Sequence, residues 1–236
     1  MNISDFKKAL SCTTPIFFGY LAIGIPFGLM LVSAGYPWWM SIVMSVTMYS
    51  GTGQYMAVGL FAAGAKLPAI IIAEILINIR HIVYGLSLIK PFKNTGLWKP
   101  YLIFSLTDET YAVLTSCEVP KGVKASSFYA TICMADHFYW ILGSVIGAIA
   151  GNFIPQQYLQ GVDFALTALF IVLLIEQIKK SKNFIPPVIG IACTLLIIIL
   201  SRMGFIPSQH ILIIAITFGI AVLILFKKKL EAKKDE

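Results

Sequence analysis

Charged side chains are scarce in this sequence, and their scarcity excludes an ordinary soluble domain. Only 12% of the 236 residues are Asp, Glu, Lys or Arg, whereas 58% are hydrophobic. Soluble domains carry about 25% charged residues, so half of the usual charge is missing and a surface that faces water could not be covered. The mean hydropathy of +0.84 agrees with this conclusion. We therefore expect an integral membrane protein.

Common catalytic and metal-binding motifs are also missing. The sequence contains no HExxH, CxxC or GxxxxGK[ST] pattern, so it lacks the ligands of a zinc protease and the phosphate cradle of a nucleotide hydrolase. Its four cysteines are widely spaced and predict neither a disulfide framework nor a metal site. We expect no enzyme, no cofactor, no bound metal and no ATP-driven pump.

Long apolar runs follow one another along the whole chain. A bilayer core of roughly 30 Å needs about 20 helical residues per crossing, so the runs predict an all-α polytopic protein with seven or eight transmembrane helices. We expect one membrane domain over residues 1–236, with short tails at about 1–13 and 227–236 and no removable signal peptide. The runs lie at approximately 15–34, 38–63, 67–89, 100–116, 125–150, 162–178, 184–202 and 209–226.

The basic residues predict the orientation of the chain. With eight crossings and the N-terminus inside, thirteen Lys and Arg residues lie in inner loops and four in outer loops. If the short run 100–116 re-enters instead of crossing and the N-terminus lies outside, the same counts result. The positive-inside rule therefore places the C-terminus in the cytoplasm, and Lys7 and Lys8 before the first run favour eight crossings. These residues read as membrane anchors, so no nucleic-acid partner is expected.

Two runs contain residues that interrupt helices. The second run holds Gly51, Thr52, Gly53 and Gln54 in its middle, and the first holds Pro26. An unsatisfied amide in hydrocarbon costs on the order of several kcal/mol, so a broken helix persists only inside protein or along a watery cavity. The N-terminus of a half-helix attracts an anionic group, which makes residues 51–54 candidates for substrate binding. Close helix packing through the glycines is the alternative.

A second glycine pattern predicts helix packing. Gly143, Gly147 and Gly151 are four residues apart and share one helix face, which allows a neighbouring helix to approach closely. That neighbour belongs either to the same chain or to a partner subunit.

Ionisable side chains inside the runs are the strongest functional signal, because each is costly in lipid and must face protein or water. Arg80 suits a substrate carboxylate, Asp108 or Asp136 suits an ammonium, and the histidines suit proton transfer. The alternative is an internal ion pair between Arg80 and Glu74, Asp108 or Asp136. The full set of candidates for substrate binding or a proton pathway, besides residues 51–54, is Asn78, Arg80, His81, Asp108, Glu109, Asp136, His137 and Asp163.

Four ordered motifs carry a family resemblance. They are NIRHIVYG at 78–85, SLTDETY at 105–111, DHFYWILGSVIGAIAG at 136–151 and GVDFALTALF at 161–170. Together they resemble the AzlC-like family of branched-chain amino-acid permeases, the large subunit of a two-component exporter. The resemblance implies a transporter in the inner membrane of a prokaryote that exports leucine, isoleucine, valine or similar amino acids, usually with a small AzlD-like membrane partner.

The residues and the resemblance together predict a secondary transporter. A zwitterionic amino acid would place its carboxylate at residues 51–54 or Arg80 and its ammonium at Asp108 or Asp136, with its side chain against Tyr49, Tyr84 or Trp140. In the absence of a nucleotide motif, the proton gradient is the simplest driving force. The alternative is a channel or a structural membrane subunit for another small solute.

Overall fold

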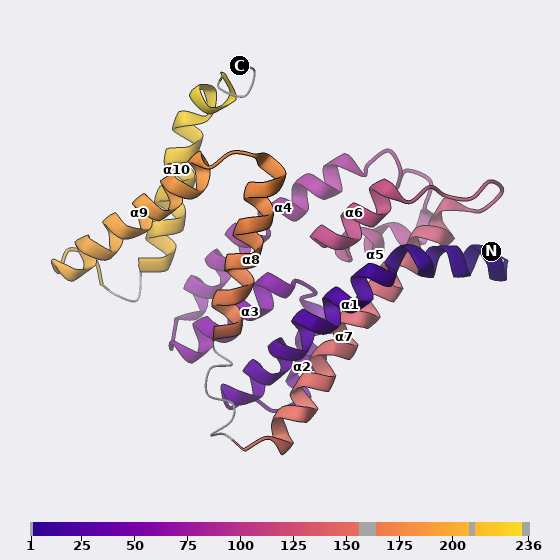
Figure 1. Cartoon of the computed structure of the whole chain (residues 1–236), viewed down its shortest axis with the longest axis horizontal. Helices are drawn as coiled ribbons and strands as arrows, with labels where there is room; N and C mark the ends of the chain where they lie inside the picture. The colour runs from indigo at the N-terminus through magenta and orange to yellow at the C-terminus, as the bar shows by residue number, and fades with distance from the viewer. Residues whose placement is uncertain (1, 156–163, 208–210, 233–236) are drawn as a thin grey trace. The chain divides into compact units, whose positions relative to one another are not determined.

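The computed structural model describes residues 2–155, 164–207 and 211–232. Throughout these ranges the regular secondary structure is helical, which confirms the predicted all-α class (Figure 1). Within the same residues, four helices are long and apolar enough to cross a membrane: α1 (Ile3–Ser33), α4 (Leu67–Ser87), α7 (Ala125–Phe153) and α9 (Ile185–Arg202).

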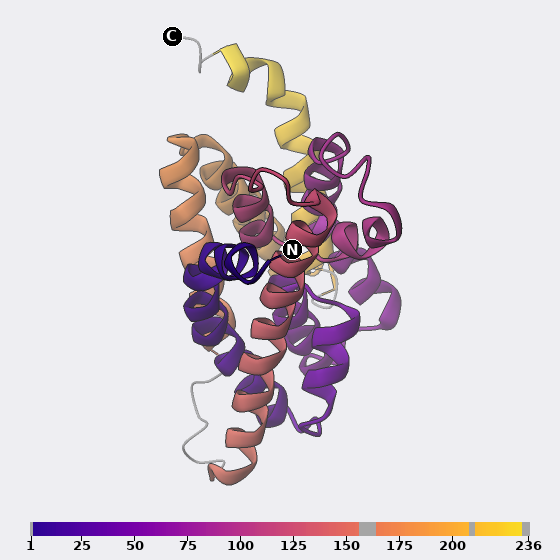
Figure 2. The same cartoon turned by 90° about the vertical axis from the view of Figure 1, so that its right-hand side faces the viewer.

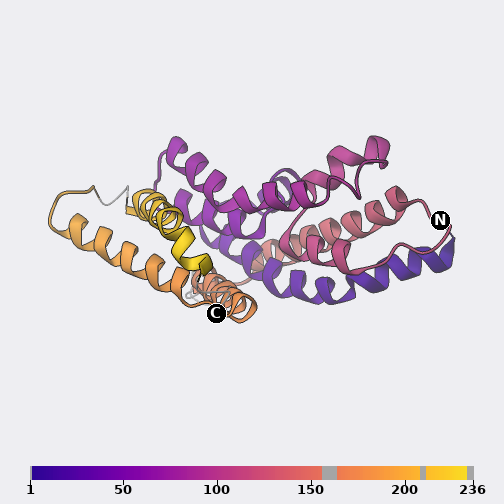
Figure 3. The same cartoon turned by 90° about the horizontal axis from the view of Figure 1, so that it is seen from above.

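The helices belong to two compact units, and the candidate site lies in the first. The first unit comprises Met1–Ala62 and Ile77–Leu166, and the second comprises Ala63–Leu76 and Thr167–Glu236. In the second unit, α9 packs against α10 (Ile211–Ala232), as Figure 1 shows, and α8 (Phe164–Ser181) precedes this pair in the chain. The first unit is built on α1 and α7, which lie side by side in Figures 2 and 3.

Small residues bring α1 and α7 into backbone contact. A Cβ added at Gly28 would collide with the carbonyl oxygen of Ser144, and one added at Gly147 would collide with the carbonyl oxygen of Ile25. The face formed by Gly143, Gly147 and Gly151 is thus covered by α1 of the same chain. Such close approach lets the two backbones pack without a hydrophobic driving force, which lipid does not provide.

The contacts between α1 and α7 show that the two helices run parallel. The hydroxyls of Thr13, in the first half of α1, and Tyr139, at the middle of α7, are 3.3 Å apart. Further along, Gly24 meets Gly143, and near the end Gly151 meets the side chain of Val32. Residue numbers therefore increase in the same direction on both sides of the contact.

Pro26 does not interrupt α1, so the expected break at this position is wrong. The helix continues from Ile3 to Ser33 through both Pro15 and Pro26. A proline inside a helix removes one backbone donor, and nearby polar groups often supply a partner for the affected carbonyls. Here the hydroxyl of Tyr55 donates to the carbonyl oxygen of Ile23 at 2.7 Å, one turn before Pro26.

The second run is broken as predicted, but slightly earlier in the chain. It forms α2 (Met40–Thr47) and α3 (Gly51–Ala62), separated by residues 48–50. Gly51, Thr52, Gly53 and Gln54 form the first turn of α3 instead of the break itself. The break is made by Tyr49, whose φ of 37° lies in the left-handed region that side chains other than glycine rarely adopt.

The run at 100–116 is also interrupted. It forms η1 (Gly96–Trp98), α5 (Lys99–Phe104) and α6 (Asp108–Ser116), with residues 105–107 between the last two helices. Thr107 caps α6 because its hydroxyl oxygen accepts the amide N–H of Thr110 at 3.1 Å. Asp108 and Glu109 then occupy the first turn, where negative charge is favourable.

One pair of cysteines corrects the expectation that the chain holds no disulfide. Cys12 on α1 and Cys117 at the end of α6 are joined by a disulfide, with their Cα atoms 6.5 Å apart. They are 105 residues apart in the sequence, so spacing could not reveal the pair. Cys133 and Cys193 are free and buried.

Candidate functional site

The first turns of α3 and α6 are connected through Arg80 on α4. Its Nη1 atom lies 2.6 Å from Asp108 Oδ2, and its Nη2 atom donates to the hydroxyl of Thr52 at 3.0 Å. Tyr84, one turn after Arg80, also donates to Asp108. Of the three ion pairs considered for Arg80, the structure forms the one with Asp108. Both side chains are about one-third exposed, at 33% and 30%.

The break itself is held by hydroxyl and amide groups. The hydroxyl of Ser50 donates to Asn78 Oδ1 on α4 at 2.6 Å, and its oxygen accepts the amide N–H of Gly53 at 3.3 Å. Ser50 therefore connects the break to α4 and supplies a partner for one amide in the first turn of α3.

Gln54 is completely buried and ties three helices together. Its Oε1 accepts the indole N–H of Trp140 on α7 at 2.5 Å, and its Nε2 donates to the hydroxyl of Ser45 on α2 at 3.3 Å. Ser45 in turn donates to Ser144 on α7 at 2.9 Å. This geometry gives Gln54 a positioning role at the break.

His137 lies directly against the break, and its contacts fix its tautomer. Its Nε2 lies 3.0 Å from the carbonyl oxygen of Ser45, which only accepts hydrogen bonds, so Nε2 carries the proton. Its Nδ1 lies 3.1 Å from the hydroxyl of Tyr101, which then donates to it. The ring stacks on Tyr49 with centroids 4.1 Å apart. In an unbroken helix the Ser45 carbonyl would accept the amide of Tyr49. His137 thus stabilises an acceptor at the end of α2.

Asp136 is the most deeply buried acid of the cluster, with 0% exposure. Its Oδ2 accepts the hydroxyl of Thr110 at 2.8 Å. Its Oδ1 and the hydroxyl of Tyr49 are both buried, and no described residue hydrogen-bonds to either atom. Unpartnered buried polar atoms are rare and costly, so this part of the site has capacity for a polar group that binds there.

The residues matched by a known family span this whole cluster. Residues 15–154 match the family model described as AzlC protein. The chain belongs to the AzlC family. The match starts within α1 and runs to the end of α7, so the AzlC-family region includes every polar contact of the candidate site.

Relatives of this AzlC-family protein cover most of its length. The branched-chain amino acid transport protein AzlC of Bacillus subtilis is 32% identical over 227 residues, which are 96% of this chain and 87% of that protein. A Helicobacter pylori protein described as an uncharacterized membrane protein is 38% identical over 229 residues, covering 97% and 98%. The inner membrane protein YgaZ of Escherichia coli is 27% identical over 190 residues, 76% of each chain. No solved structure matches. Together with the apolar helices, these relatives identify a multi-pass membrane protein.

The structure of this AzlC-family chain also separates some predicted site residues from the cluster. His81 neighbours Tyr84, with ring centroids 6.0 Å apart, and has no contact with the break among the interactions described. Asp163 lies outside the described residues. Sequence reasoning missed several hydroxyl groups, since a single Ser, Thr or Tyr in an apolar run carries no signal of its own. They are Tyr20, Ser45, Tyr101, Thr107, Thr110 and Ser144.

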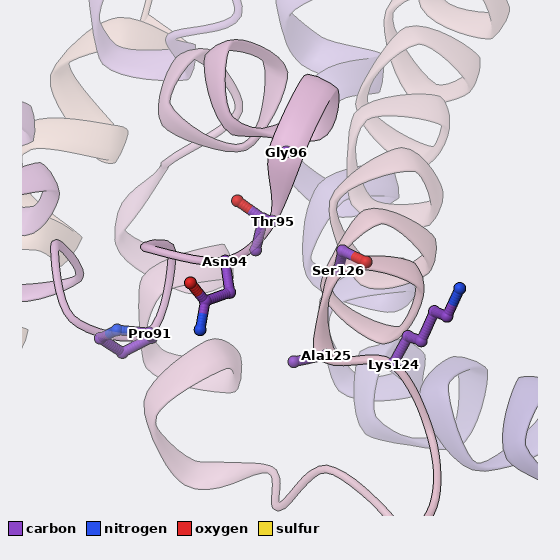
Figure 4. Close-up of a pocket in the computed structure, with 7 residues that line it drawn as sticks. All are labelled: Pro91, Asn94, Thr95, Gly96, Lys124, Ala125 and Ser126. Atoms are coloured by element: carbon purple, nitrogen blue, oxygen red, sulfur yellow. The ribbon is translucent and has the colours of Figure 1, made fainter.

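A hollow of about 500 Å³ opens away from the cluster of this AzlC-family protein. Figure 4 shows that it lies between the segment after α4 and the start of α7. Its lining contains none of the predicted site residues, and consists of Pro91, Asn94, Thr95, Gly96, Lys124, Ala125 and Ser126. We therefore place the candidate site at the two breaks instead of in this hollow.

Proposed function

We propose that this protein is a secondary transporter that exports branched-chain or similar apolar amino acids across the cell membrane of a prokaryote. The name of the Bacillus subtilis relative supports the substrate class. The observation that carries the proposal is Asp136, a fully buried acid with a free acceptor oxygen beside a helix break. Ionisable groups at such depth mark substrate or ion pathways.

The two charged ends of an amino acid fit different parts of the cluster. Asp108 is already neutralised by Arg80, so Asp136 is the better partner for the substrate ammonium, with the hydroxyl of Tyr49 beside it. The carboxylate belongs at the first turn of α3, near Thr52 and Arg80, where a helix N-terminus and a guanidinium both favour an anion. The apolar side chain then lies toward Trp140.

The part of the cluster around Asp136 is closed to solvent, so transport requires movement. Asp136 is fully buried and Tyr49 is only 2% exposed. Substrate therefore reaches Asp136 when the short helices around the breaks separate from α7. Movement of short elements around a central site is the usual basis of alternating access in transporters with broken helices.

The parallel packing of α1 and α7 supports eight crossings. Parallel helices that both cross a membrane are separated by an odd number of crossings. The three intervening elements satisfy this condition if α2–α3, α4 and α5–α6 all cross. If only the 100–116 run failed to cross, α1 and α7 would be antiparallel. We therefore propose eight spans with both termini in the cytoplasm, in accordance with the positive-inside rule.

The proton gradient is the proposed driving force, and a small AzlD-like membrane subunit is the proposed partner. The first follows from the missing nucleotide motif, and the second from the family resemblance. The glycine face of α7 is occupied by α1, so the partner docks on another surface.

Efflux of radiolabelled leucine from cells preloaded with a leucyl dipeptide tests the proposal. The chain alone, the chain with its small partner and an empty membrane are compared, with insertion verified in each case. Faster efflux than from the empty membrane supports an exporter, and a requirement for the partner supports the two-component form. Efflux equal to the empty membrane in both combinations overturns the proposal. A flux that rises linearly with leucine concentration without saturating favours a channel.

A further inference from the structure

Hydroxyl groups connect the two acids Glu109 and Asp136 in one unbroken line. The hydroxyl of Tyr20 lies 3.2 Å from Glu109 Oε2 and 2.6 Å from the hydroxyl oxygen of Thr107. The Thr107 hydroxyl lies 3.1 Å from that of Thr110, which lies 2.8 Å from Asp136 Oδ2. The line runs from Glu109 on α6 to Tyr20 on α1, returns to Thr107 and Thr110 at the start of α6, and ends at Asp136 on α7.

Counting protons shows what this line requires. It has four hydrogen bonds but only three hydroxyl groups, and each hydroxyl donates one proton. All four bonds are made only when one of the two carboxyl groups supplies a proton. A proton on Glu109 makes every bond point toward Asp136, and a proton on Asp136 makes every bond point toward Glu109. The line is therefore complete with exactly one proton shared between the two acids.

We propose that Glu109, Tyr20, Thr107, Thr110 and Asp136 form a proton relay that couples transport to the proton gradient. The proposal rests on the proposed transport function and names the groups that carry its proton. Hereafter we call these five residues the relay.

The transfer itself breaks and forms an equal number of O–H bonds. The proton of the Glu109 carboxyl moves to the oxygen of Tyr20 as the Tyr20 proton moves to Thr107. The Thr107 proton moves to Thr110, and the Thr110 proton moves to Asp136. Glu109 is left as a carboxylate and Asp136 becomes a carboxylic acid, so one proton has crossed the relay without any other reactant.

Burial gives the relay a direction. Glu109 is partly exposed, whereas Tyr20 is 3% exposed and Thr110 and Asp136 are fully buried. The relay therefore joins a partly exposed acid to a fully buried one. Glu109 also lies next to the Arg80–Asp108 pair.

The surroundings of Asp136 explain how the proton and the substrate exclude each other. Among the residues that the structure describes, the ion pair of the cluster joins Arg80 to Asp108, and none joins a lysine or arginine to Asp136. A buried carboxylate without a cation is costly. Asp136 is therefore neutralised in turn by a proton from the relay or by the substrate ammonium at Oδ1. Export of one amino acid then accompanies entry of one proton.

Proteoliposomes that contain the full chain, with its partner if efflux needs one, separate the relay from the substrate site. Two rates are measured: leucine–leucine exchange at equal pH, and leucine movement driven by a pH gradient. Tyr20→Phe removes one hydroxyl from the relay and keeps the ring. Tyr139→Phe is the matched control, because Tyr139 lies on the same α1–α7 contact and its hydroxyl bonds only Thr13 among the described partners.

A second pair of variants distinguishes loss of the relay from misfolding of one variant. Thr110→Val breaks the relay on α6, and Thr115→Val is its control, because the hydroxyl of Thr115 is exposed and donates within its own helix. A positioned proton-transfer group contributes about a hundredfold or more, so each relay variant should lower gradient-driven movement by at least about tenfold. Leucine–leucine exchange, which moves no net proton, should fall by much less than gradient-driven movement.

The possible results distinguish the relay from the transport function. A much larger loss of gradient-driven movement than of exchange, with both controls normal, supports the relay. Equal loss of both rates in Tyr20→Phe and Thr110→Val, or no loss in either, overturns it. Wild-type protein that exchanges leucine but does not respond to a pH gradient also overturns it and leaves the transport function intact. Wild-type protein that neither exchanges nor moves leucine overturns both.

Discussion

Arg80 and Asp108 form an ion pair, with Nη1 2.6 Å from Oδ2, that joins α4 to the first turn of α6. Because Arg80 also donates to Thr52, the same guanidinium connects the starts of both half-helices, α3 and α6. The two breaks are therefore positioned relative to each other by one side chain. A lysine could keep the charge but not the planar fork that reaches two partners.

Asp108→Asn should slow leucine efflux by about tenfold, because Arg80 then loses the charged partner that aligns α6. The free energy of unfolding should fall by only about 1 kcal/mol or less, since both side chains are partly exposed and solvent screens the pair. Efflux and thermal unfolding of the inserted protein measure the two effects. Glu118→Gln is the control, because Glu118 is exposed after α6. Efflux at the wild-type rate would remove Asp108 from the mechanism.

Asp136→Asn should abolish both exchange and gradient-driven movement, by about a hundredfold or more. The amide has the same shape but cannot hold an ammonium by charge or accept a relay proton. This outcome differs from that of Tyr20→Phe, which should lower gradient-driven movement much more than exchange. The same leucine assays decide the question. An Asp136→Asn protein with normal exchange would place the substrate ammonium elsewhere.

Gly147→Ala should destabilise the first unit by about 1–3 kcal/mol, because the added methyl group overpacks the contact with the backbone of α1. Gly19→Ala is the matched control, since nothing lies within 4 Å of a Cβ added there and alanine favours a helix by up to about 1 kcal/mol. Thermal unfolding in detergent should show a lower midpoint for Gly147→Ala only. Equal midpoints for both variants would contradict the close contact.

Reduction of the Cys12–Cys117 disulfide should lower the free energy of unfolding by about 2–4 kcal/mol, because the bond closes a long loop in the unfolded chain. Unfolding curves with and without a thiol reductant measure the difference. Cys12→Ser should unfold like the reduced protein and be insensitive to the reductant. A wild-type curve that the reductant does not shift would show that the bond contributes nothing to stability.

Local sequence features predicted the helices and one of their breaks, but long-range pairing required the fold. Gly51 and Gly53 predicted the interruption of the second run, because glycine weakens any helix. They could not show that Tyr49, a bulky residue, makes the break. The hydrogen bond of Tyr20 to Thr107 joins positions 87 residues apart, and Cys12 and Cys117 are similarly distant. Such pairs depend on how helices pack, which composition and periodicity do not encode.

If the protein transports its substrate as proposed, the contact between α1 and α7 is the part that we expect to stay fixed. At Gly28 and Gly147 the backbones are already so close that neither helix can slide without collision. The short helices α2, α3, α5 and α6 are joined to their neighbours in part by hydroxyl, amide and ionic contacts. We therefore expect the α1–α7 pair to stay fixed during the proposed transport cycle, while the two broken segments, α2–α3 and α5–α6, move against it. A proton or a substrate bound at Asp136 on α7 would then determine the direction in which these segments move.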